Sequence, residues 1–312
     1  MSTRRAQAER CSRSEPHDYS SAKDHTVAYK SSPRPSYDGP AHIPAASAIR
    51  HLWGDNISGQ VPDWCYVSTD KIHQLVLGLH PGGAFRHSEQ YKTRFAADEL
   101  YYVLSGELAL ANPETGEVHL AKRDQAIFFR RDTWHHGFSV GSDALRVLEI
   151  LSPPPSKGSC GEYALDLPDL EIRKYGQDEY LGRWPMAQAK ASAEYTMHVI
   201  RDADVMWRLE GKDQSLAVAI LVSTEHLTVG KAQIRPGDPS TPRVHGGDLA
   251  LYVLEGTVHV RLPDRDRPNY FECASGDGFY VPEGVPYQLH NVTDRSSTCL
   301  FGVAPNYLPD GS

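Results

Sequence analysis

An internal repeat constrains the fold of this chain more than any other feature. The segment CYVSTDKIHQLVLGLHPGG, which begins at Cys65, aligns without gaps on ILVSTEHLTVGKAQIRPGD, which begins at Ile220. Farther along, YYVLSGELAL from Tyr101 aligns on LYVLEGTVHV from Leu251. A third pair, RDQAIFFRRDTWHHG and GDGFYVPEGVPYQLHN, follows if the first copy has one extra residue before its histidines. Three matching segments in one order indicate two copies of one structural unit.

Both copies are predicted to be all-β. Short apolar alternations recur about every ten residues, as in ELYYVLSGELALANPETG, and Gly, Pro, Asn and Asp separate them. This pattern is typical of β-sandwiches and β-barrels. Long segments with a 3.6-residue apolar period are almost absent, and residues 169–193 are the best candidate for helical turns.

Each half resembles the cupin superfamily. In that family, a first motif runs from Pro-Gly through one or two histidines to a Glu, an apolar strand and a Gly, as in PGGAFRHSEQYKTRFAADELYYVLSG. A second motif runs from Gly-Asp through an apolar strand and Pro-x-Gly to a His, as in RDQAIFFRRDTWHHGF and GDGFYVPEGVPYQLHN. The resemblance implies a bicupin, with two tandem jelly-roll barrels, and a metal held inside a barrel if one is bound.

Four segments are expected along the chain. Residues 1–45 are rich in Ser, Arg, Asp, Lys and Pro and are predicted to be a disordered or draped tail. Residues 46–155 would form the first barrel, with the metal site, and 156–195 a linker with helical turns. Residues 196–312 would form the second barrel. Deletion of residues 1–40 is then expected to leave the melting temperature nearly unchanged.

The resemblance implies metal ligands in the first half at His87, Glu99 and His135. Glu99 stands seven residues before Gly106, where the family has its Glu, and His135 follows Asp-Thr-Trp, where the second motif has its His. Two His and one carboxylate form the set that non-haem iron enzymes use. We therefore expect a divalent transition metal, with Fe(II) favoured and Mn, Ni or Zn as alternatives.

Two departures from the family pattern leave alternatives open. The interval from His87 to Glu99 has five more residues than the second copy, so that the segment QYKTRFAAD is a candidate for a substitute ligand or a lid. If they do not bind a metal, His87 and His135 are ordinary polar residues at a barrel mouth. His136 alternates away from His135, so it is expected to face outward or to support the site, and His135→Ala is expected to reduce metal content far more than His136→Ala.

Three further residues are candidates for catalysis. Arg130 and Arg131 stand where the family usually has Pro-x-Gly, and two arginines at a barrel mouth suit a carboxylate or phosphate of a substrate. Solvated surface is the alternative for both. Tyr101 shares a strand face with Glu99, because side chains two residues apart lie on the same side of a strand, and is a candidate proton donor.

The second half has largely lost the metal motif. Its residue in the Glu position is Leu249, beside Asp248, and its residue in the second-motif His position is Tyr287. His245 and His290 are the remaining candidates, and they make a poor ligand set. A structural role is therefore expected for this half.

Composition excludes several classes of function. The formal net charge of −8 argues against a nucleic-acid partner, which requires a basic face. No apolar run approaches the length of a membrane span, and the N-terminus has no apolar signal region. The five cysteines are scattered without a Cys-x-x-Cys pair, which suits a reducing cytoplasm. A cytoplasmic homo-oligomer acting on a small molecule is expected.

Three functions follow from these expectations. The first is a metal-dependent enzyme on a small carboxylate or aromatic substrate, with oxygenase (dioxygenase-like) chemistry ahead of decarboxylase, isomerase or lyase chemistry. The second is a non-catalytic binding or storage protein. The third is an oligomeric scaffold. Metal analysis of the purified protein separates the first from the other two.

Overall fold

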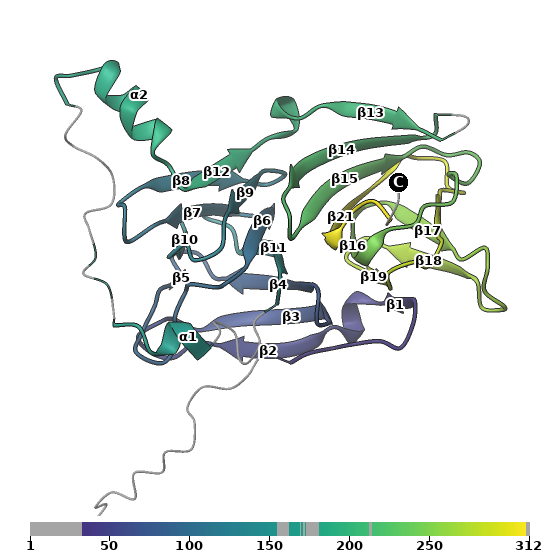
Figure 1. Cartoon of the computed structure of the whole chain (residues 1–312), viewed down its shortest axis with the longest axis horizontal. Coiled ribbons are helices and arrows are strands. Elements are labelled where there is room, and N and C mark those ends of the chain that lie inside the picture. The colour runs from purple at the N-terminus through teal and green to yellow at the C-terminus, as the bar shows by residue number, and fades with distance from the viewer. Residues whose placement is uncertain are drawn as a thin grey trace, which may run out of the picture.

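The computed structural model describes residues 33–154, 162–168, 170, 172, 181–211 and 214–309 (Figure 1). Within these residues two β-barrels follow one another, so the all-β, two-barrel prediction is confirmed. None of the helices in this part of the chain is long and apolar enough to cross a membrane. The helical elements are η1 (Ala45–Ser47), α1 (Glu162–Leu165), α2 (Met186–Ala193) and η2 (Asp202–Asp204).

The first barrel consists of a seven-stranded and a four-stranded sheet, with a core of apolar side chains between them. In sheet order, the seven-stranded sheet contains β12 (Met197–Ile200), β9 (Ala126–Phe129), β6 (Asp98–Ser105), β11 (Leu145–Ser152), β4 (His73–Leu79), β3 (Val61–Ser68) and β2 (Ile49–Trp53). The four-stranded sheet contains β5 (Ala84–Phe85), β10 (His136–Ser139), β7 (Glu107–Ala111) and β8 (Val118–Lys122).

The second barrel repeats this plan with a seven-stranded and a three-stranded sheet. In sheet order, the seven-stranded sheet contains β1 (Ala41–Ile43), β19 (Gly278–Val281), β16 (Gly246–Glu255), β21 (Ser297–Asn306), β15 (Thr228–Ile234), β14 (Leu216–Ser223) and β13 (Trp207–Glu210). The three-stranded sheet contains β18 (Tyr270–Ala274), β17 (Thr257–Arg261) and β20 (Gln288–His290).

The two barrels exchange one strand each. β1 precedes the first barrel in the chain but pairs with β19 of the second, and β12 precedes the second barrel but pairs with β9 of the first. Each exchanged strand covers an edge that would otherwise expose unpaired N–H and C=O groups. The predicted start of the second barrel is therefore corrected, because β12 belongs to the sheet of the first.

The predicted tail also belongs partly to the fold. Besides β1, the Tyr37 hydroxyl donates a hydrogen bond to the Tyr66 carbonyl (2.8 Å), and the Ser68 N–H donates one to the Pro35 carbonyl (2.7 Å). The tail boundary at residue 45 is therefore too late. The structure describes the chain from residue 33 onward, and residues 1–32 lie outside the described part.

Two buried aspartates connect the barrels. Asp98 of the first accepts a hydrogen bond from the Thr224 hydroxyl of the second (2.6 Å), and Asp248 of the second lies 3.4 Å from the Lys71 ammonium of the first. An apolar cluster from the outer faces of both seven-stranded sheets fills the space between the barrels. These contacts give both aspartates a structural role, which explains why both copies of the repeat have one at this position.

A chain that begins at residue 45 is expected to melt about 5 °C or more below a chain that begins at residue 33. The shorter chain loses β1 and the Tyr37 bond and leaves the β19 edge unpaired, and for a protein of this size each kcal/mol of lost stability lowers the melting temperature by about 2–4 °C. Thermal unfolding followed by circular dichroism measures the difference. Melting temperatures within 1 °C of each other would show that β1 contributes little.

Candidate functional site

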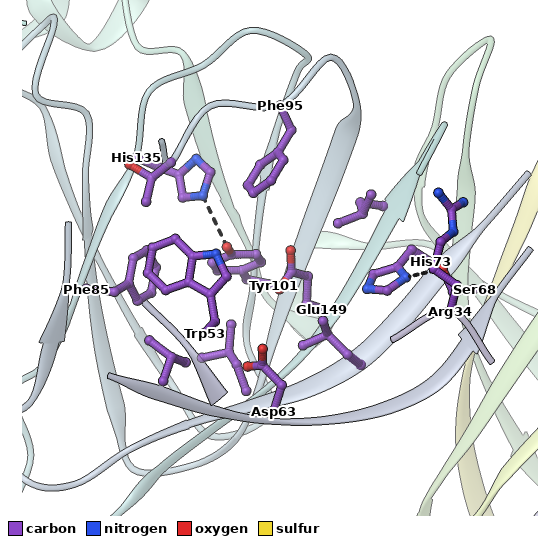
Figure 2. A pocket seen from close by; sticks show the side chains of 15 residues that line it. Arg34, Trp53, Asp63, Ser68, His73, Phe85, Phe95, Tyr101, His135 and Glu149 are labelled. Atoms are coloured by element: carbon purple, nitrogen blue, oxygen red, sulfur yellow. Dashed lines mark hydrogen bonds between the residues drawn. The ribbon is translucent and has the colours of Figure 1, made fainter. Parts of the chain in front are cut away.

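A cavity of about 60 Å³ lies inside the first barrel (Figure 2). Apolar side chains, among them Trp53, Phe85 and Phe95, form much of its wall. At about 10–15 Å³ for each water, this volume holds roughly five water molecules or a small organic molecule. The polar lining residues are Arg34, Asp63, Ser68, His73, Thr93, Tyr101, His135 and Glu149.

Strand β6 supplies two of the predicted site residues. Glu99 and Tyr101 are two positions apart and therefore point to the same, inner face. Tyr101 lines the cavity, and Glu99 is 1% exposed. Burial, followed by the nearby carboxyl groups of Glu149 and Asp98, raises the pKa of Glu99 well above its ordinary value. Its environment therefore favours the uncharged form of the carboxyl group.

His135 faces the same space from the turn that follows β9. Its Nδ1 lies 3.2 Å from the Thr133 carbonyl, so Nδ1 carries the proton, and Nε2 accepts a hydrogen bond from the Tyr101 hydroxyl (3.2 Å). Nε2 is also 4.0 Å from Oε2 of Glu99. Burial lowers the pKa of His135 to about 4, which keeps the imidazole neutral.

His87 is not part of this group. Its Nδ1 lies 2.7 Å from Nε2 of His136, and its ring lies against Trp134. Within β10, Gly137 pairs with an inner-face leucine of β7, so His136 points to the other face of the sheet, as expected. The predicted triad of His87, Glu99 and His135 is therefore not assembled. In the described part of the chain, no group of three His, Cys, Asp or Glu side chains is placed to hold a metal ion.

The two arginines predicted as an anion clamp do not line the cavity. Arg130 lies outside it, 3.0 Å from Asp98 and hydrogen-bonded to Glu225 of the second barrel. Arg131 is about half exposed and lies 3.4 Å from Asp132. The structure thus corrects both assignments, because these cations pair with acids at the barrel surface and between the barrels. The arginine that does line the cavity is Arg34.

Two acids that were not predicted lie in the cavity wall. Asp63, on β3, is 5% exposed and Glu149, on β11, is 6% exposed. Burial raises the pKa of Asp63 to about 6, although its hydrogen bond with His51 (3.2 Å) acts in the opposite direction. Burial and the charge of Asp63 raise the pKa of Glu149 to about 8. Near pH 7, Asp63 is therefore mostly ionised and Glu149 mostly protonated.

Comparison with known proteins identifies the fold. A cupin-domain family model matches residues 79–151. No curated protein matches the chain in sequence. A solved structure of a Pseudomonas aeruginosa protein described as glyoxylate-induced has a TM-score of 0.61 and 16% identity, over 88% of this chain and 95% of that one. This chain has the bicupin fold.

Two further similar structures span both barrels of this bicupin. The Escherichia coli protein Ylba has a TM-score of 0.57 at 10% identity, over 91% of this chain and 97% of that one. A variant of Bacillus subtilis oxalate decarboxylase has a TM-score of 0.56 at 13% identity, over 89% of this chain and 80% of that one. At these identities the likeness shows the fold alone, so the activity must be argued from the site.

The two barrels of this bicupin can be superposed residue by residue through matching hydrogen bonds. The N–H of His135 donates to the Thr93 carbonyl (3.0 Å), and in the second barrel the N–H of Tyr287 donates to the Arg243 carbonyl at the same distance. Thr93 thus corresponds to Arg243, and His135 to Tyr287.

A second pair of bonds extends the match. The Asp132 N–H donates to the Phe95 carbonyl (2.7 Å), and the Gly284 N–H donates to the His245 carbonyl (3.0 Å). Asp132 and Gly284 both have the positive φ of a left-handed turn, at 66° and 74°. Phe95 therefore corresponds to His245, and counting on along β6 and β16 pairs Glu99 with Leu249.

These equivalences show which side chains of the first barrel stand at the positions of metal ligands. The site positions carry Thr93, Phe95, Glu99 and His135, and the phenyl ring of Phe95 lies 5.6 Å from the ring of His135. Protein ligands bind a transition metal at about 2.0–2.2 Å, so Glu99 and His135, 4.0 Å apart, are within reach of one ion. A phenyl ring supplies no third donor. The first barrel therefore lacks the predicted two-His-one-carboxylate set.

The second barrel also shows which polar residues the fold does not need. Strand register matches Asp63 with Val218, because each lies opposite the corresponding residue of β4 or β15. It likewise matches Glu149 with Phe301, which packs over Gly230, where a Cβ would lie 2.3 Å from the Phe301 ring.

The cavity residue of β6 also has an apolar counterpart in the second barrel. Tyr101 corresponds to Leu251, since these residues lie opposite Glu149 and Phe301 in the two sheets. Barrel 2 thus forms with apolar side chains at positions where barrel 1 buries acids and a phenol. Burying such polar groups costs free energy, so their presence in barrel 1 indicates a function.

Proposed function

We propose that the first barrel of this bicupin is the active site of an enzyme that transfers protons on a small carboxylic acid. The observation that carries the proposal is the pair of buried acids in one cavity, Asp63 with a pKa of about 6 and Glu149 with a pKa of about 8. Two carboxyl groups whose environments separate their pKa values are suited to act as base and acid at neutral pH.

The chemistry needs no oxidant or other co-reactant. Ionised Asp63 takes a proton from the carbon next to a carbonyl group, and protonated Glu149 gives its proton to the carbonyl oxygen. The C–H bond breaks, an O–H bond forms, and the product is the enol of the substrate. Return of a proton to a different atom completes an isomerisation, and return to the same carbon in heavy water replaces hydrogen by deuterium.

The hydroxyl of Tyr101 and the ring of His135 position the substrate oxygen. His135 is held by Thr133, so its Nε2 fixes the direction of the Tyr101 hydroxyl. Burial, followed by the nearby carboxyl groups, raises the pKa of Tyr101 well above its ordinary value, which keeps the phenol protonated. When the Tyr101 hydroxyl turns its one proton from Nε2 of His135 to the substrate oxygen, it stabilises the developing oxyanion.

This proposal replaces the oxygenase chemistry expected from the sequence with the isomerase or lyase alternative. The oxygenase expectation depended on two histidines and one carboxylate around Fe(II). Of the two histidines that line the cavity, His135 lies near Glu99 and His73 lies at the other end. The size of the cavity supports a small acid. One structural neighbour, oxalate decarboxylase, is named for a small dicarboxylic acid. Binding without chemistry is the second candidate, favoured by the apolar part of the cavity wall.

A deuterium-exchange screen tests the proposal. The protein is incubated in heavy water at pH 7 with 2-oxo acids of three to five carbons, and proton NMR follows loss of the C–H signal next to the carbonyl. We expect exchange above the uncatalysed rate for at least one acid, and little exchange with Glu149→Gln.

The matched control is Glu107→Gln, because Glu107 lies at the exposed start of β7, outside the cavity. This variant should keep the wild-type rate. Tight binding of an acid by the wild type without exchange would contradict the enzyme proposal and favour the binding function.

A further inference from the structure

Arg34 lies at one end of the cavity. It belongs to the segment that precedes β1, and its Nη2 donates a hydrogen bond to the Thr69 carbonyl (2.9 Å), which fixes the guanidinium. Figure 2 shows Arg34 beside His73 and Ser68, whereas His135 lies at the other end of the cavity.

The charge of Arg34 is unusual in this cavity. Among the described residues that line it, Arg34 is the one Arg or Lys. Burial, and next the charge of Arg34, lower the pKa of His73 to about 4, and burial does the same for His135. Both histidines are therefore neutral near pH 7. A guanidinium pairs well with a carboxylate, which it binds through two parallel hydrogen bonds.

The opposite end offers polar side-chain atoms. In the described part of the chain, Oγ1 of Thr93 and Oε2 of Glu99 are buried without a hydrogen-bond partner. A buried polar atom without a partner costs about 1–3 kcal/mol, so a ligand oxygen that reaches these atoms would be favoured. The hydroxyl of Tyr101 lies near the same end, bonded to His135.

We propose that Arg34 is a specificity-determining residue that selects substrates with a carboxylate beside a carbonyl or hydroxyl oxygen. The carboxylate pairs with Arg34, and the second oxygen meets Thr93, Glu99 and Tyr101. The carbon that bears the reacting C–H bond, which is C3 of a 2-oxo acid or C2 of a 2-hydroxy acid, then faces Asp63 and Glu149, which Figure 2 places in the middle of the cavity. This inference rests on the proposed function and names its substrate class as short 2-oxo or hydroxy acids.

The test compares a charged probe with its neutral counterpart. Binding of pyruvate and of pyruvamide is measured by calorimetry for the wild type, Arg34→Gln and Arg34→Lys. Arg34→Gln should weaken pyruvate binding at least tenfold and change pyruvamide binding less than twofold. Arg34→Lys should restore part of the pyruvate affinity, because it keeps the charge and loses the planar fork. Arg50→Gln, an equal charge change at an exposed position of β2, should have no effect.

Each other result overturns the inference. Equal loss for the acid and the amide would assign Arg34 a structural role, and absence of pyruvate binding to the wild type would remove the substrate class. Failure of the proposed function looks different, since pyruvate would then bind in an Arg34-dependent way without deuterium exchange. Thr93→Val gives a second readout, because it should weaken pyruvate and leave propanoate, which has no second oxygen, unchanged within twofold.

Discussion

Replacing Asp63 by Asn is expected to lower the rate of deuterium exchange by about 10²–10⁴-fold, the usual contribution of a positioned acid or base. Asparagine keeps the shape of the side chain and its place beside His51 but cannot accept the proton from carbon. Glu149→Gln should have an effect of similar size, because the amide cannot donate a proton to the carbonyl oxygen. Exchange rates at saturating substrate, with folding checked by circular dichroism, measure both.

A variant with both Asp63→Asn and Glu149→Gln shows whether the two residues act in one chemical step or in two independent steps. If Asp63 and Glu149 act in one proton relay, the combined loss should be close to that of either single variant. Wild-type exchange in either single variant would contradict the assignment of that residue. Glu107→Gln again serves as the control for charge.

Glu149→Gln is also expected to stabilise the protein at high pH. The pKa of Glu149 is about 8 in the folded protein, against 4.5 for an ordinary Glu, so the folded state holds its proton more tightly than the unfolded state. Its contribution to stability is complete below pH 4.5 and is lost as the pH rises through 8. Glutamine does not titrate, so the variant avoids this loss.

The expected gain of the variant at pH 8.5 is about 4–5 kcal/mol, since the pKa of Glu149 rises from 4.5 to about 8 on folding and each pKa unit corresponds to about 1.4 kcal/mol. Urea unfolding at pH 4.5 and at pH 8.5 measures this gain. The wild type and Glu149→Gln should have nearly equal stability at pH 4.5. If the difference in unfolding free energy between the two proteins does not change with pH, Glu149 has an ordinary pKa in the folded protein. Loss of activity with gain of stability in one substitution is typical of a functional residue.

The architecture followed from the sequence because the repeat marks strands rather than single residues. The match of Tyr101 with Leu251, and of Cys65 with Ile220, holds in the strand register of both barrels. The position of His135 beside Glu99 also followed from its motif. The exchange of β1 and β12 did not, because a strand of three or four residues has no distinct pattern and its partner is set by the packing of the barrels.

The error at His87 arose from the insertion in the first copy. Counting forward from Pro81 places His87 where a ligand is expected, whereas counting backward from Glu99 leads to Phe95 and Thr93. The structure follows the backward count, since the inserted residues come before Thr93. The second copy held the signal, because His245 precedes Leu249 by the same four residues that separate Phe95 from Glu99.

Asp63 and Glu149 were missed because they lie in apolar strands. In RVLEILS and VPDWCYVS an acid stands in the alternation of inward residues, where a hydrophobic side chain is the rule. Aligning the last strands of the two repeats would have shown that Glu149 occupies the position of Phe301. Both pKa values depend on burial, that of Asp63 also on His51 and that of Glu149 also on Asp63, and only the folded arrangement determines these contacts.

The most direct test of the account is the pH dependence of exchange by protein stripped of divalent metals with a chelator. We predict a bell-shaped profile of kcat/KM that rises near pH 6, as Asp63 loses its proton, and falls near pH 8, as Glu149 loses its own. Stripping should leave the profile unchanged. Activity that disappears on stripping and returns with an added metal ion would contradict the account.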